Sequence, residues 1–399
     1  MRLAILLVLM IGTLVVFGGC VPFCWPHADF AASVQWGQAA LPVQFTDQST
    51  PGRAPITQWH WDFGDGETDT SQNPLHVYTV PGAYTVELTV TTERGSSKKT
   101  WPDCIVVGEN EVVTWNNKAL EAVADAQLMP PQAGRILAMM HVAMHDAVNA
   151  AQPLNEPYCY APDVVPEGAC KEAAAAQAAY DVLIFAFPAK AVDFDTQLAQ
   201  SFAAMPDDAG KTLGVQLGQE AAAAILALRA DDGSQAMAME PYTGGTEPGQ
   251  WRPTPPMNAP GAFYPWRLVE PFAMTSPDQF RPGPPPALDS VDYASDLNEI
   301  KTLGSKTNST RTMDQSMVAN FWVGMAGTVG EAGRMNLVAQ QAAEANQNTL
   351  HDNAALFALV NIALADAAIA GLDCKYTYSF WRPITAIREA AGDNNEQTT

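Results

Sequence analysis

The sequence has few basic residues, few histidines and no paired cysteine motif. In 399 residues, 21 lysines and arginines stand against 43 aspartates and glutamates, giving a formal net charge of -22. Such an acidic surface repels nucleic acid and anionic lipid, so we expect neither to be a partner. The six cysteines include no Cys-x-x-Cys pair, so nothing supports a cysteine-rich zinc site or a thioredoxin-like motif. Any anion site must therefore concentrate positive charge locally.

The N-terminus has the pattern of an export signal. Met1 and Arg2 precede an apolar run over residues 3–17 that ends in Gly-Gly-Cys20 and is short for a membrane span. Phe17 to Cys20 resembles a bacterial lipobox, so we expect a signal peptide over residues 1–19 and lipidation of Cys20. A plainly cleaved signal and an uncleaved anchor are the alternatives. Each predicts a cell-envelope, periplasmic or secreted protein whose only membrane contact is through its anchor.

Export also permits disulfides. Cys159 and Cys170 flank a short polar segment that contains proline and glycine and separates two helical patterns. We expect a disulfide between these two residues to close that loop.

Residues 28–107 have the pattern of a small antiparallel β-sandwich. Short alternating apolar runs are separated by clusters of glycine, proline, asparagine and serine. The runs lie at residues 34–36, 43–46, 57–62, 84–91 and 104–107.

The motifs of this first module identify it further. Residues 59–66 read Trp-His-Trp-Asp-Phe-Gly-Asp-Gly, and Asn-Pro-Leu-His-Val-Tyr and Pro-Gly-Ala-Tyr-Thr-Val follow at residues 73–78 and 81–86. Together these stretches resemble the PKD domain, an immunoglobulin-like module. The resemblance implies a spacer, or a module that contacts a protein or a carbohydrate, and no chemistry of its own.

The acidic residues near this turn permit two interpretations. Asp62, Asp65, Glu67 and Asp69 form a group of oxygen donors of the kind that calcium prefers. We favour the alternative, in which Asp62 and Asp65 accept hydrogen bonds from turn amides and the other carboxylates are solvated.

The second module, residues 112–399, changes from a period of two to a period near 3.6 and predicts an all-α helical bundle. Helices are expected at residues 115–126, 132–151, 171–187, 209–230, 291–303, 311–325, 330–346 and 353–372, with another beginning at Pro383. Their many alanines predict close packing. Residues 241–286 interrupt the pattern with 13 of the 30 prolines and several aromatic residues, which predicts an ordered loop draped over the helices, forming a wall of a site.

The motif that carries chemistry is Lys375-Tyr-Thr-Tyr-Ser-Phe380-Trp381-Arg382-Pro383. Pro383 disfavours a helical conformation at Arg382 and suits the first position of a new helix. We therefore expect Lys375 near the end of one helix and Arg382 at the start of the next, so that both cations converge on one oxyanion.

Lys-x6-Arg-Pro resembles the first of three motifs of the vanadium-dependent haloperoxidase and type 2 phosphatidic acid phosphatase superfamily. Residues 139–150, 249–256, 276–281 and 363–367 also resemble bacterial haloperoxidase-like members. The resemblance implies that Lys375 and Arg382 hold the oxygens of vanadate, the cofactor, or of isosteric phosphate. Two simpler roles remain open: the cations interact only with carbonyls or with carboxylates such as Asp373, and Phe380 and Trp381 either wall the site or pack in the core.

The sequence departs from the family after this motif. None of its six histidines follows Lys375, whereas the family's second and third motifs supply the histidine ligand or nucleophile and the acid-base histidine. We therefore expect a chain that stops after the first motif and is inactive as it stands.

The histidines earlier in the chain offer a different site. His141 and His145 are four residues apart on a predicted helix, a spacing that chelates zinc, with Asp146 beside them. Their apolar neighbours favour buried, hydrogen-bonded core histidines instead, and we expect no metal there. His351 is expected near the start of a helix.

Three functions are compatible with the sequence. The first is an exported vanadium haloperoxidase-like protein that uses peroxide and a halide. The second is an acid phosphatase of the same superfamily that uses a phosphate ester, and the third is a non-enzymatic cell-surface binding protein.

Overall fold

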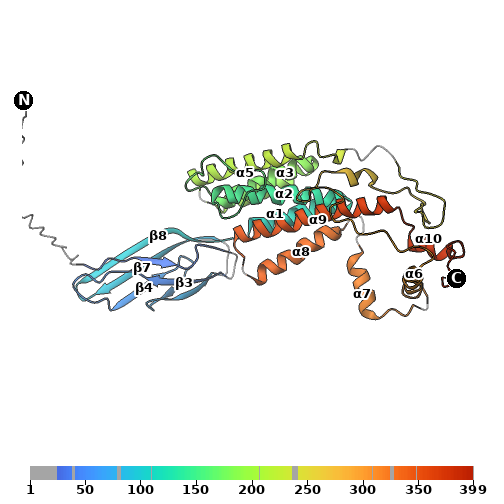
Figure 1. Cartoon of the computed structure of the whole chain (residues 1–399). Coiled ribbons are helices and arrows are strands. Elements are labelled where there is room, and N and C mark those ends of the chain that lie inside the picture. The colour runs from blue at the N-terminus through green and yellow to red at the C-terminus, as the bar shows by residue number, and fades with distance from the viewer. Residues whose placement is uncertain are drawn as a thin grey trace, which may run out of the picture. The chain divides into compact units, whose positions relative to one another are not determined.

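A computed structural model describes residues 25–37, 41–78, 82–108, 110–205, 207–235, 241–307, 309–323, 328–346 and 348–398. The chain divides after Gly108 into two compact units, one built of strands and one of helices (Figure 1). The predicted fold class, a small all-β unit followed by a helical unit, is confirmed. The predicted signal peptide and Cys20 lie outside the described residues.

Two sheets form the β unit. One has the order β1-β3-β6 and the other β2-β8-β7-β4-β5, and all neighbouring strands are antiparallel except β2 and β8. The strands are β1 (Phe30–Ala32), β2 (Trp36–Gly37), β3 (Leu41–Asp47), β4 (Gln58–Asp62), β5 (Thr68–Asp69), β6 (Leu75–Tyr78), β7 (Gly82–Thr92) and β8 (Gly95–Val107). The sequence pattern located β3, β4, β7 and the end of β8, and it missed the short strands β1, β5 and β6.

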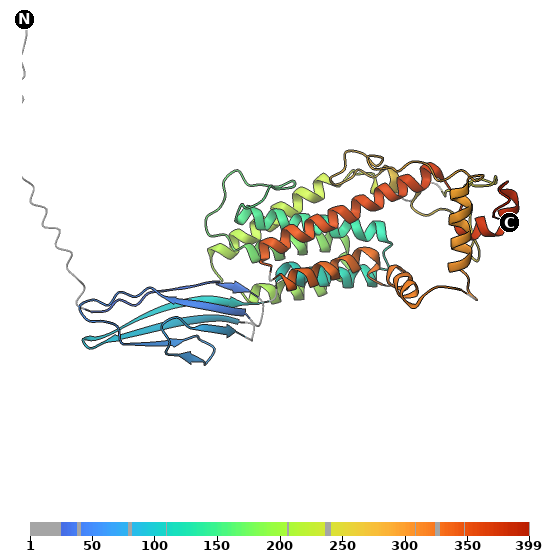
Figure 2. The same ribbon diagram turned by 60° about the horizontal axis from the view of Figure 1, so that its bottom comes forward.

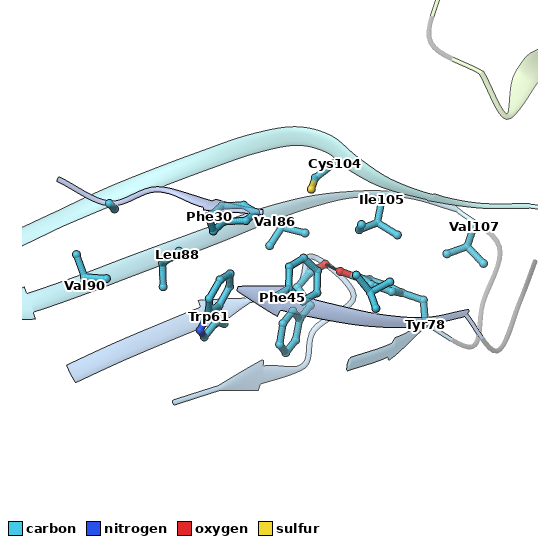
Figure 3. Packing of buried hydrophobic residues seen from close by; sticks show 13 residues of the cluster. Phe30, Phe45, Trp61, Tyr78, Val86, Leu88, Val90, Cys104, Ile105 and Val107 are labelled. Carbon is cyan, nitrogen blue, oxygen red and sulfur yellow. Dashed lines mark hydrogen bonds between the residues drawn. The ribbon is translucent and has the colours of Figure 1, made fainter. Parts of the chain in front are cut away.

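Alternating side chains of these strands fill one core. Val86, Leu88 and Val90 of β7 are fully buried, as period-two alternation requires when one sheet face is covered. Figure 3 shows Phe30, Phe45 and Trp61 meeting at its centre, with the Trp61 ring centroid 5.2 Å from that of Phe30 and 5.4 Å from that of Phe45. Such aromatic contacts add to the stabilisation from area burial.

The acidic turn after β4 is held by its own amides. Asp62 Oδ1 accepts from the Gly64 amide and Asp65 Oδ1 from the Glu67 amide, both at 3.0 Å. Asp65 Oδ2 lies 2.7 Å from His76 Nε2. These bonds are those of the predicted turn, and the described residues contain no group of three or more potential ligands that suits a metal ion.

The helical unit contains the predicted helices and one that the pattern missed, α4. They are α1 (Glu111–Asp125), α2 (Pro130–Ala151), α3 (Lys171–Ala186), α4 (Ala191–Ala203), α5 (Ala209–Leu228), α6 (Val291–Leu303), α7 (Met313–Trp322), α8 (Gly330–Ala345), α9 (Leu350–Tyr378) and α10 (Pro383–Arg388). Short 3-10 turns include η3 (Tyr264–Leu268). Helix α4 was missed although Phe194, Leu198 and Phe202 recur along it at helical spacing; only Phe194 and Ser201 of this helix are buried.

Helix α2 lies at the centre of the bundle and packs against α3, α5 and α9 (Figure 2). Small residues bring these helices close together, as the alanine content predicted. A Cβ added to Gly218 of α5 would lie 2.6 Å from the Ala174 carbonyl oxygen of α3, so the observed approach requires glycine. Helix α9 is long and apolar enough to cross a membrane, and one face of it packs against α2 and α8.

The proline-rich segment is ordered and anchored. The Asp366 carboxylate of α9 accepts hydrogen bonds from the backbone amides of Phe272, Ala273 and Met274 at 2.6, 2.8 and 2.8 Å. Trp251 and Trp266 are buried at 4% and 3% exposure. These contacts attach the segment to α9.

The predicted disulfide between Cys159 and Cys170 is contradicted, because both residues are free thiols. Cys170 is the N-cap of α3, and its sulfur accepts from the Ala173 amide at 3.5 Å. The Cys159 amide is held separately by Asp146 at 2.8 Å. Cys170 therefore caps α3, whereas Cys159 belongs to the loop that Asp146 of α2 holds, a division that their spacing in the sequence did not reveal.

Candidate functional site

Helix α9 carries Lys375 in its last turn. The helix begins with a capping box formed by Thr349 and Asp352, which satisfies its first amides. Its C-cap is Ser379, which adopts a left-handed conformation with φ of 45° and donates its amide to the Lys375 carbonyl at 3.0 Å. A cation in the last turn is favoured by the partial negative charge of a helix C-terminus.

Arg382 precedes the next helix. Its backbone is extended, with ψ of 153°, and it is the N-cap of α10, in which Pro383 is the first residue. This is the break that the Arg-Pro sequence predicted, because proline excludes the α conformation from the residue before it and suits the first helical position. Lys375 and Arg382 are thus presented by two different helices across one turn.

The proline-rich segment clamps this turn. The Trp251 amide donates to the Ser379 carbonyl at 2.6 Å, and the Trp381 amide donates to the Gly249 carbonyl at 2.9 Å. The Tyr242 hydroxyl bonds the Ser379 hydroxyl. Residues 249–251 were noticed in the sequence only as part of a resemblance. Their role in holding the turn depends on a long-range pairing that no local pattern encodes.

The charges of the two cations act on each other. The pKa of Lys375 is lowered, first because surrounding protein partly desolvates its ammonium group and second because Arg382 repels it. The residue as a whole is nevertheless exposed to solvent. The Arg382 charge also acts on Tyr376, whose pKa is raised overall because burial outweighs it. Lys375 Nζ lies 5.5 Å from the Tyr376 ring centroid.

Neither cation forms an ion pair within the residues that the structure describes. Asp373, the carboxylate that could have neutralised Lys375, is instead bound at both oxygens by Arg281, at 2.6 and 2.8 Å. The interpretation in which Asp373 pairs with Lys375 is therefore wrong. A bidentate arginine occupies this carboxylate and leaves the ammonium and the guanidinium available to an external anion.

Phe380 and Trp381 belong to a packed cluster. Trp381 is 4% exposed and contacts a small core that includes Tyr293 and Leu297 of α6, with Phe380 partly buried against it. Of the two roles left open by the sequence, core packing is the one seen.

The early histidines lie elsewhere in the helical unit. His351 precedes Lys375 by 24 residues on α9, which corresponds to about 36 Å of helix. His141 is fully buried with Nε2 3.0 Å from Asn116 Oδ1, and burial lowers its pKa to about 3. His145 is paired with Asp146. His141 is thus a hydrogen-bonded core histidine, as predicted, and the described residues offer no metal site around either histidine.

Comparison with known proteins agrees with both resemblances. Residues 25–107 match the PKD domain family, and residues 355–398 match the VCPO second helical-bundle domain. The chain aligns with the crystal structure of the first bacterial vanadium-dependent iodoperoxidase with a TM-score of 0.63 and 23% identity, covering 71% of this chain and 72% of that one. The likeness to the iodoperoxidase shows a shared fold.

The curated relatives match through the β unit. Collagenase ColA of Bacillus cereus is 45% identical over 58 residues, which are 14% of this chain and 6% of that protein. Pre-pro-metalloprotease PrtV of Vibrio cholerae is 38% identical over 72 residues, which are 18% of this chain and 7% of that protein. The chain therefore spans less than a tenth of the length of these relatives.

Proposed function

We propose that the helical unit is an oxyanion-binding scaffold of the vanadium haloperoxidase type, in which Lys375 and Arg382 hold the oxygens of vanadate. The observation that carries the proposal is the pair of unneutralised cations on two helices, joined by a clamped turn. The family match over residues 355–398 includes both of them.

The donor set suits a tetrahedral oxyanion. An ammonium offers three N–H donors and a guanidinium five, and neither accepts a hydrogen bond, so together they select an anion with several oxygens. The overall charge of -22 opposes anion binding elsewhere on the surface. The exposure of both side chains leaves them accessible to a ligand from solution.

The roles of these residues follow from their chemistry. Arg382 would orient the anion with paired N–H donors, while Lys375 would add a compact positive charge. Repulsion between the two cations is relieved when an anion binds between them, so binding should raise the lowered pKa of Lys375. A bound vanadate would supply the activation of peroxide for halide oxidation.

The proposed vanadate site has no nearby histidine among the residues of this sequence. No histidine follows Lys375 in the sequence, and His351 lies about 36 Å away along α9. We therefore expect the 399-residue chain to bind vanadate without oxidising bromide.

The proposal also includes export of the protein and a contact role for the β unit. The leader pattern over residues 1–19 and Cys20 supports a cell-envelope lipoprotein or a secreted protein. The β unit, which matches domains of a collagenase and a metalloprotease, would contact a surface protein or carbohydrate.

Vanadate titration of the purified chain tests the proposal, with line broadening in vanadium-51 NMR as the readout at low ionic strength. We expect Lys375→Gln and Arg382→Gln each to weaken binding on the order of fivefold to tenfold, because a charged hydrogen bond contributes about 1.5–3 kcal/mol and exposure reduces it. Phosphate should compete for the same site.

Arg388→Gln is the matched control, since Arg388 is an exposed arginine on α10 with no ion pair in the described residues. Unchanged vanadate binding in the Lys375→Gln, Arg382→Gln double variant would refute the oxyanion site. A chain with no vanadate affinity at all would support the non-enzymatic alternative, and phosphate ester hydrolysis without bromide oxidation would support the phosphatase.

A further inference from the structure

A cavity of about 270 Å³ lies in the helical unit, away from Lys375. Its walls come from α2, from residues 155–158 and from the first half of α9, and include Val142, His145, Tyr158, Ala355, Ala358 and Ile362. Ala355 precedes Lys375 by 20 residues on α9, or about 30 Å along the helix. The cavity is therefore a separate feature from the two cations.

His145 is one of the residues that line this cavity. Its Nδ1 lies 3.0 Å from Asp146 Oδ1, and Asp146 also accepts from the amides of Tyr158, Cys159 and Tyr160 at 2.7, 2.8 and 2.8 Å. Burial tends to raise the pKa of Asp146, but these bonds outweigh it and hold the pKa below its usual range. An ionised carboxylate only accepts, so Nδ1 carries a proton, and in the neutral imidazole Nε2 then keeps its lone pair.

Nε2 of His145 has no hydrogen-bond partner among the described residues, and the side chain keeps 11% exposure. The hydrogen bond between His145 and Asp146 thus fixes the tautomer and the ring orientation of His145. The other residues that line the cavity are mainly apolar.

A second imidazole nearby also lacks partners. His351 is 6% exposed, and neither of its ring nitrogens has a partner among the residues described. It lies one turn before Ala355 on α9, and His145 is close enough to act on its charge. His351 is not one of the residues that line the cavity, so a ligand in it would meet the imidazole of His145.

The volume and the wall chemistry limit the class of ligand. An enclosed apolar cavity of about 150 Å³ holds benzene. This cavity is partly open to solvent and, at about 270 Å³, accommodates a substituted single ring. The carboxylates of Asp146 and Glu156 disfavour an anion, and the described residues provide no set of three metal ligands. A hydroxyl donor is the group that a neutral Nε2 accepts.

We propose that the cavity binds a small, mostly apolar molecule that carries a hydroxyl group, a phenol in its simplest form, whose O–H donates to His145 Nε2. The apolar ring lies against Ala355, Ala358 and Ile362. This site is independent of the vanadate proposal and is assigned by none of the resemblances above.

Calorimetric titration of the full chain with phenol and with benzene tests the proposal. Phenol should bind on the order of fivefold more tightly than benzene, because one hydrogen bond separates them. His145→Phe keeps a ring of similar size and should abolish that preference. In nitrogen-15 NMR of the imidazoles, phenol should shift the His145 Nε2 signal of the unaltered chain.

Two α9 variants keep the proposal falsifiable if His145→Phe fails to fold. Ala355→Leu fills the cavity and should remove phenol binding, whereas Ala367→Leu, at an exposed position farther along α9, should leave it unchanged. Equal affinities for phenol and benzene, phenol binding that survives Ala355→Leu, or an unmoved Nε2 signal at saturation would each overturn the site.

Discussion

Replacing Asp366 by asparagine should loosen the proline-rich segment from α9. The carboxylate is 5% exposed and accepts three consecutive backbone amides, one at Oδ1 from Phe272 and two at Oδ2 from Ala273 and Met274. Asparagine retains one oxygen and places an N–H donor where the other stood. In either orientation at least one amide faces a donor.

The magnitude follows from these three bonds. A hydrogen bond to a charged group contributes about 1.5–3 kcal/mol, so losing one bond and removing the charge from the others should cost about 3 kcal/mol. For a domain of this size, that cost lowers the midpoint of thermal unfolding by about 6–10 °C. The β unit has its own core and should keep its transition.

Differential scanning calorimetry measures the change, and Asp296→Asn serves as the matched control. Asp296 is an exposed carboxylate on α6 with no hydrogen bond or ion pair in the described residues. Hydrogen exchange at the amides of residues 272–274 should quicken only in Asp366→Asn. If the two variants unfold within about 1 °C of each other, or if those amides stay protected, Asp366 is not the anchor.

Two further predictions concern stability. Because the pKa of His141 is about 3 in the folded chain and about 6.5 when unfolded, the unfolded state binds more protons between those values, and the helical unit should lose about 2 kcal/mol between pH 7 and pH 5. His141→Gln should remove that part of the loss, and identical pH slopes in urea titrations would contradict the assignment. Gly64 has φ of 81°, and a Cβ there would lie 2.5 Å from the Thr85 carbonyl oxygen, whereas Gly66, with φ of 94°, has open space around it. Gly64→Ala should therefore destabilise the β unit by at least about 1 kcal/mol more than Gly66→Ala, and calorimetry showing equal effects would reject the clash.

Asp146 and Asp366 show what helical patterns leave undetermined. Each is an isolated aspartate in an apolar helix, and each accepts hydrogen bonds from the backbone amides of three consecutive loop residues. The sequence marks such residues as unusual, because an unpaired buried carboxylate is costly. Which loop supplies the amides depends on contacts across about 90 residues in one case and about 13 in the other.

The sequence by itself determined the division into a β unit and a helical unit, since side-chain periodicity changes with the backbone repeat. It also determined the turn between Lys375 and Arg382, because proline restricts the residue before it whatever surrounds them. Only the tertiary structure decided that Asp373 binds Arg281 and leaves Lys375 unpaired, that Cys159 and Cys170 stay apart, and that His145 faces a cavity. These outcomes depend on which distant segments meet, and local conformational preferences carry no information about that.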